Sequence, residues 1–273
     1  MASMQQLHDK FARMGARVKV GPLVRRNRWD NSTDELRIDV RTDKEGEFFE
    51  VLERPGKVVD LFPLEVDPRD RHLLLFARVL DEKEQAQKRR FLCGHDERHW
   101  FVAAVPGNAS SVRAAKQALK PDLVRAREAR VGLSTRAKNR RKNDAYLRQG
   151  EWFFTPEPKV RFQEKWIFRN EPLRRGGGKP HRCEFLVRSG GETVYVHPQY
   201  PNGLTQTEYG NLLKARPKLR NEKWTVMRRD PGVYVKGRVS HPDHKTILLP
   251  CWHFVSLNTE SQAPGAKFVA FLD

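Results

Sequence analysis

The chain has 273 residues, of which 38% are hydrophobic and 32% are charged, and its formal net charge is +18. Fifteen Phe and six Trp provide enough large apolar side chains for folded cores, which excludes a disordered chain. The three cysteines are too widely spaced for a disulfide framework, and no stretch is apolar over the roughly 18 residues that a transmembrane helix needs. We therefore expect a cytoplasmic protein of two domains with no membrane partner.

The positive charge is concentrated in the C-terminal half of the chain. Residues 1–119 contain 22 Lys and Arg against 19 Asp and Glu, whereas residues 120–273 contain 30 against 15. Like charges repel one another in a folded domain unless a counter-charge is bound, and nucleic acid is the commonest polyanionic partner. The charge distribution therefore predicts that the C-terminal half binds nucleic acid.

The N-terminal part is predicted to be a helix followed by an antiparallel sheet. Apolar residues spaced by three and four positions indicate a helix over residues 4–14, and the basic residues 17–28 are expected to form an extended arm or loop. Apolar and polar residues then alternate between turn signals, which predicts a meander of antiparallel strands over residues 36–105. A helix over residues 108–119 is expected to close this nearly neutral domain, residues 1–119.

The remaining chain is predicted to be a basic linker and a β-rich domain. Apolar side chains become sparse over residues 120–149, which favours a basic helical linker. Residues 150–273 form the strongly basic second domain, with one helix that begins at a Thr205–Glu208 capping box and a late hairpin over residues 233–255. The predicted class is α+β, with predominantly antiparallel sheets, a few short helices, and two β-rich domains joined by the linker.

Three basic tracts, residues 136–148, 159–182 and 214–238, are the candidate nucleic-acid-binding surface. Cationic side chains neutralise phosphates, and exposed aromatic rings can stack on unpaired bases, although rings in strands are more often core residues. The rings within the last two tracts are Phe162, Trp166, Phe168, Trp224 and Tyr234. The candidate contacts are Arg136, Lys138, Arg140, Arg141, Lys142, Arg174, Arg175, Lys179, Arg182, Lys214, Lys218, Arg220, Arg228, Arg229, Lys236 and Arg238.

The late hairpin also contains a group of residues that can bind metals. His241 and His244 bracket a Pro-Asp turn, and Cys251 and His253 lie two positions apart on one face of the returning strand. These four residues could bind Zn²⁺, or the three histidines could act as acids and bases in phosphoester cleavage. The spacing matches no specific zinc motif, and turn and strand chemistry accounts for all four residues. We therefore expect no cofactor.

The favoured hypothesis is a non-enzymatic nucleic-acid-binding protein within a larger nucleoprotein assembly. RNA or single strands are preferred over duplex DNA because the sequence contains no recognition-helix motif, and the N-terminal domain would contact other proteins. One alternative is a metal-independent or zinc-assisted phosphoesterase or nuclease that uses His241, His244 and His253. The other is a structural protein whose basic half docks on an acidic protein partner.

Overall fold

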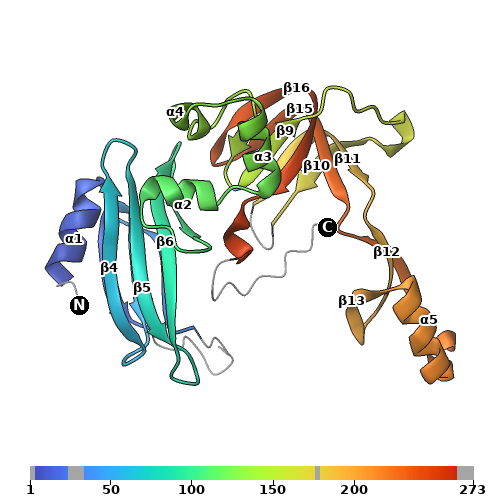
Figure 1. Cartoon of the computed structure of the whole chain (residues 1–273), viewed down its shortest axis with the longest axis horizontal. Helices are drawn as coiled ribbons and strands as arrows, with labels where there is room; N and C mark the ends of the chain where they lie inside the picture. Colours follow the sequence, from blue (N-terminus) through green and yellow to red (C-terminus); the bar gives the residue numbers. More distant parts are fainter. Residues whose placement is uncertain (1–3, 24–33, 176–178, 263–273) are drawn as a thin grey trace. The chain divides into compact units, whose positions relative to one another are not determined.

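The computed structural model describes residues 4–23, 34–175 and 179–262, and Figure 1 labels many of its helices and strands. The chain divides into two compact units. Among the described residues, the first unit comprises residues 4–153, 243–245 and 257–262, and the second comprises residues 154–242 and 246–256.

The first unit contains two sheets, of order β1-β3-β2 and β4-β5-β6-β7. All neighbouring strands in these sheets are antiparallel except β1 and β3. Its strands are β1 (Val18–Pro22), β2 (Leu36–Asp43), β3 (Gly46–Glu53), β4 (Val58–Asp67), β5 (His72–Leu80), β6 (Ala86–Asp96), β7 (His99–Ala104) and β8 (Leu147–Gln149). Its helices are α1 (Met4–Arg13), α2 (Val112–Ala118), α3 (Asp122–Arg130), α4 (Thr135–Lys138) and the 3-10 turn η3 (Thr259–Gln262).

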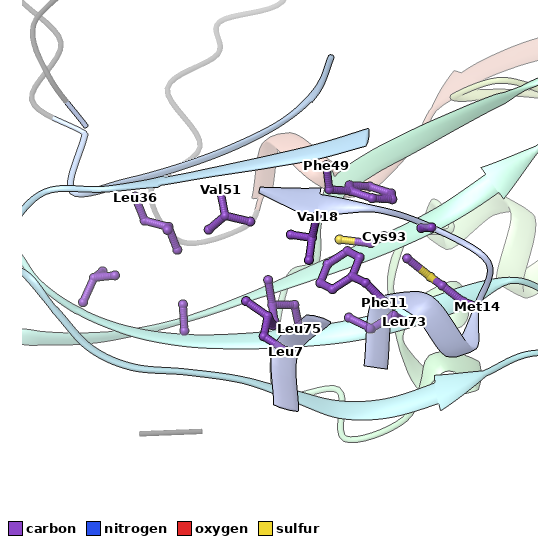
Figure 2. Close-up of a cluster of buried hydrophobic side chains, with 13 residues drawn as sticks. Leu7, Phe11, Met14, Val18, Leu36, Phe49, Val51, Leu73, Leu75 and Cys93 are labelled. Atoms are coloured by element: carbon purple, nitrogen blue, oxygen red, sulfur yellow. The ribbon is translucent and has the colours of Figure 1, made fainter. Parts of the chain in front are cut away.

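The core of the first unit lies on both faces of β5. Leu73 and Leu75 point to one face, where they join Leu7 and Phe11 of α1 in a fully buried cluster (Figure 2). Leu74 points to the other face and packs with side chains of α2. A strand covered on both faces needs a continuous apolar run, which is what β5 has, and each such buried side chain contributes about 1.5–3 kcal/mol.

Residues 120–149, predicted as a basic helical linker, hold α3, α4 and β8 and have a small core. The rings of Tyr146 and Phe153 meet edge to face, with their centroids 5.2 Å apart. Beside them Lys120 Nζ donates a hydrogen bond of 2.5 Å to Glu128 Oε1, and both side chains are almost fully buried. A buried charge needs such a partner, because a single charge left alone in the core would be strongly destabilising.

The second unit also contains two sheets, in which the pairs β10–β11, β11–β15, β12–β13 and β12–β14 are antiparallel. Among the strands assigned to this unit, the larger sheet has the order β10-β11-β15-β16-β9, and the smaller has the order β13-β12-β14. The elements that lie mainly in this unit are β9 (Trp152–Pro156), η1 (Glu164–Trp166), β10 (Phe168–Leu173), β11 (His181–Ser189), β12 (Glu192–His197), β13 (Tyr200–Thr205), α5 (Gln206–Ala215), η2 (Pro217–Asn221), β14 (Thr225–Arg229), β15 (Gly232–His241) and β16 (His244–Leu257). The strands β15 and β16 are the predicted late hairpin, and α5 begins at the predicted Thr205–Glu208 capping box.

These elements confirm the predicted α+β class with predominantly antiparallel sheets. The predicted arm over residues 17–28 differs in part, because residues 18–22 form β1 and pair in parallel with β3. Residues 24–28 lie outside the described part of the chain. None of the described helices combines the length and the apolar character that crossing a bilayer requires.

Candidate nucleic-acid interface

Three arginines from three neighbouring strands of the second unit line one cleft. Arg169 of β10, Arg182 of β11 and Arg238 of β15 surround a space of about 460 Å³. The complete lining, which we call the arginine groove, is Arg169, Asn170, Arg182, Glu184, Phe185, Arg238, Ser240 and Thr246. The groove thus has three guanidinium groups and a single carboxylate. Guanidinium groups bind phosphate through paired N–H donors, so this composition suits a phosphate-containing ligand.

Cross-strand pairing explains why these residues share one face of the sheet. Arg169 lies opposite Phe185 in the β10–β11 pair, and Phe185 lies opposite Lys236 in the β11–β15 pair. Arg182 lies opposite Ser240 by the same pairing. Residues directly opposite in an antiparallel pair point to the same face, so the pairing places cations on both sides of the Phe185 ring.

A β-bulge in β11 completes the groove. The register between β11 and β15 shifts between Cys183 and Phe185, so that the consecutive residues Glu184 and Phe185 both line the groove. Gly237 lies opposite this shift with a φ of +83°, and an added Cβ there would lie 2.6 Å from Glu184 Oε2. The Glu184 carboxylate also accepts a hydrogen bond of 2.8 Å from the backbone N–H of Arg238. Glycine is therefore required for both the backbone conformation and the space.

The guanidinium groups of the groove are only weakly compensated. Arg169 pairs with Glu164 at 3.0 Å, but both side chains are largely exposed, and such pairs contribute about 0–1 kcal/mol. Arg182 Nη1 donates to the carbonyl oxygen of Asn170 at 3.3 Å, which leaves its charge unneutralised. Within the described residues, the Arg238 side chain makes no ion pair. The groove is consequently electropositive.

Several other predicted cations of the second unit lie outside the groove. Arg229 pairs with Glu192, and Arg228 donates to the carbonyl oxygen of Gly191, both at the β12–β14 pair. Arg174 is exposed just after β10, and the glycines at 176–178 lie outside the described residues. The exposed predicted cations on and near α5 and η2 are Lys214, Lys218 and Arg220.

The predicted tract in the first unit is divided between free and paired cations. Arg140 and Lys142 are exposed and line a second cleft, of about 370 Å³. Arg141 forms ion pairs with Asp96 and Glu97, the latter at 2.6 Å, so its charge is already compensated within the protein. This pairing makes Arg141 a structural residue of its unit, whereas its two neighbours remain accessible to a ligand.

The predicted stacking rings have different environments. Phe162 packs against Tyr234 and Trp252, with centroids 5.0 Å and 5.1 Å away, and Trp224 packs against tyrosines near α5. Trp166 and Phe168 are 58% and 50% exposed.

The sequence did not identify Phe185 or Arg169, the two residues that stack in the groove. The sequence signal for them was a ring whose partners on both neighbouring strands, Arg169 and Lys236, are basic. The bulge in β11 shifts the register, so simple alternation along the strand does not reveal these partners.

The predicted histidines differ in burial and in their local contacts. His253 is only 2% exposed, and its Nδ1–H donates a 2.8 Å hydrogen bond to the carbonyl oxygen of Cys251. Burial lowers the pKa of His253, which favours its neutral form. The ring of His241 stacks on that of His181 at 4.3 Å, whereas His244 Nδ1 lies 3.7 Å from Glu97 Oε2. Of the residues proposed for catalysis, His253 is thus a core residue.

The thiol beneath the groove is unreactive. Cys183 lies in β11 and is fully buried, and burial raises its pKa to about 12. A thiol is a nucleophile only as its thiolate, so Cys183 is a packing residue at neutral pH.

Comparisons with known proteins identify no relative, since no family model, no curated protein and no solved structure matches the chain.

Proposed function

We propose that the protein binds nucleic acid through the arginine groove of its second unit. The observation that carries this proposal is the convergence of Arg169, Arg182 and Arg238 on one cleft that contains a single carboxylate. That carboxylate, Glu184, accepts a hydrogen bond from a backbone N–H of the neighbouring strand, and its single negative charge can offset only one of the three arginines. The phosphate backbone of a nucleic acid provides the repeated negative charge that such a groove attracts.

Binding is better supported than catalysis by the residues first considered for phosphoester cleavage. An acid or base must reach the reacting group, but the ring of His253 is almost completely buried and donates to its own strand. The arginine groove, in contrast, is open to a ligand and has the charge to hold one. A non-enzymatic role as a nucleic-acid-binding component therefore remains the preferred proposal.

The test is a comparison of charge-reversal variants inside and outside the groove. Fluorescence anisotropy with a labelled oligonucleotide should show that the double variant R182E/R238E binds at least 10-fold more weakly than the wild type. The slope of log affinity against log salt should become smaller by about 1.4–1.8, the change expected when two phosphate contacts are lost. The slope matters because it counts the ionic contacts directly.

Arg161 provides the matched control. It is exposed in the same unit, and its guanidinium donates to the carbonyl oxygens of Pro158 and Val160, outside the groove. R161E should therefore retain most of the affinity and the salt slope. Equal losses in R161E and in the groove variant would contradict the proposal, as would wild-type protein that binds no oligonucleotide. Selective binding to an acidic protein would instead support the structural alternative.

A further inference from the structure

We infer that the arginine groove holds an unpaired base on the ring of Phe185, so that its preferred ligand is single-stranded nucleic acid. This inference rests on the proposed nucleic-acid-binding function and specifies its substrate class. Phe185 lines the groove and is partly exposed, and the guanidinium of Arg169 lies 5.1 Å from its ring centroid. One face of the ring therefore carries the Arg169 guanidinium, and the ring and this cation together form a flat surface within the groove.

An aromatic ring among cations recognises a base differently from a phosphate. A base can stack on the ring face or on the flat guanidinium, and every base offers a face for stacking. In a duplex the faces of the bases are already stacked on their neighbours, and only their edges are accessible in the grooves. A nucleotide must consequently be unpaired before its base can lie on Phe185.

The pairing of the strands gives the base and its phosphates separate partners. Phe185 lies between Arg169 on β10 and Lys236 on β15, and neighbouring strands are separated by about 4.8 Å. The long side chains of both cations can therefore reach phosphates on either side of a base that rests on the ring. Within the described residues, Lys236 makes no ion pair that would compete with a phosphate.

A second ring in the same strand pair provides a matched control. Phe168 is 50% exposed, and it lies opposite the fully buried Leu186, next to the pair of Arg169 and Phe185. Successive residues of a strand point to opposite faces, so Phe168 lies on the face away from the groove. Consistently, the cation near its ring is Arg188, 6.0 Å from the centroid, which does not line the groove.

The decisive experiment compares F185L with F168L on single-stranded and duplex oligonucleotides of equal length. Anisotropy at one low salt concentration should show that F185L loses about 10-fold in affinity for the single strand, as expected for one lost base stack. Its affinity for the duplex and its salt slope should remain those of the wild type, because the cations are intact. F168L should bind both ligands as the wild type does.

Control variants separate a lost stack from a damaged fold. F185Y keeps an aromatic ring and should restore single-strand binding, and circular dichroism should give the same unfolding midpoint for all three variants. The inference is wrong if F185L binds the single strand normally, if it loses both ligands equally, or if F168L shows the same loss. It is also wrong if the wild type prefers the duplex. Failure of the wild type to bind any oligonucleotide would instead remove the proposed function itself.

Discussion

At the scale of single residues, the chain separates cations that stabilise the fold from cations that remain available. Two carboxylates neutralise Arg141, and one neutralises Lys120. The three arginines of the groove, in contrast, share a single carboxylate, which accepts a hydrogen bond from a backbone N–H. Sequence composition gives every Lys and Arg the same weight, so it cannot make this distinction. The contacts of each side chain decide which charges can bind a ligand.

His72 gives a residue-scale prediction about pH. The ring is buried at the start of β5, its Nδ1 bonds the carbonyl oxygen of Asp70, and burial lowers the pKa of His72 to about 4. In the unfolded chain the imidazole titrates near its usual pKa of about 6.5. The unfolded state therefore binds a proton first as the pH falls, so stability present above pH 6.5 is lost between about pH 6.5 and pH 4.

Urea unfolding at two pH values checks this prediction. We expect the free energy of unfolding to be lower by about 2 kcal/mol at pH 5 than at pH 7 because of His72 alone. H72Q removes the titrating group while it keeps a polar side chain, so the difference between pH 5 and pH 7 should shrink by that amount. An unchanged pH dependence in H72Q would show that other groups cause it.

At the scale of elements, local patterns predict local pairing. Alternating residues predicted the meander that includes the β2–β3 hairpin, and the capping box predicted where α5 begins. The parallel pairing of β1 with β3 joins strands separated in sequence and has no turn signal. The groove has the same difficulty, since Arg182 and Arg238 were predicted as contacts but their meeting with Arg169 depends on register across three strands.

The bulge in β11 gives an element-scale prediction. Gly237 has a φ of +83°, and an added Cβ would collide with Glu184, so G237A should both strain the backbone and displace that carboxylate. We expect G237A to reduce the free energy of unfolding by about 1–3 kcal/mol. Thermal unfolding measures this loss.

A second glycine of the same unit offers a control for the bulge. Gly210 lies within α5 of the same unit, and an added Cβ there would meet no atom within 4 Å. G210A should maintain or slightly raise stability, because alanine favours helix over glycine by about 1 kcal/mol. If G237A were equally well tolerated, the bulge would not need glycine, and the geometry of the groove would not depend on it.

At the scale of the whole molecule, the charge distribution places stability and binding in opposition. Residues 120–273 contain twice as many cations as acids, and this excess repels itself in the folded state. Salt weakens this repulsion, since the Debye length falls from about 30 Å at 0.01 M to about 10 Å at 0.1 M. Salt also weakens the attraction to phosphates, because the release of counterions from the nucleic acid contributes less binding free energy when the salt concentration is high.

Salt should therefore change stability and affinity in opposite directions. Between about 10 mM and 200 mM sodium chloride we expect the thermal midpoint to rise, while oligonucleotide affinity falls by orders of magnitude. At low salt, a bound oligonucleotide should raise the midpoint as well, since it binds only the folded state and supplies the missing counter-charge. The thermal midpoint of R182E/R238E should rise less than that of the wild type on addition of either salt or oligonucleotide, because this variant lacks two of the repelling positive charges and carries two additional carboxylates. A thermal midpoint that falls with salt would show that attractive surface ion pairs outweigh the repulsion, and that the excess charge does not destabilise the unbound protein.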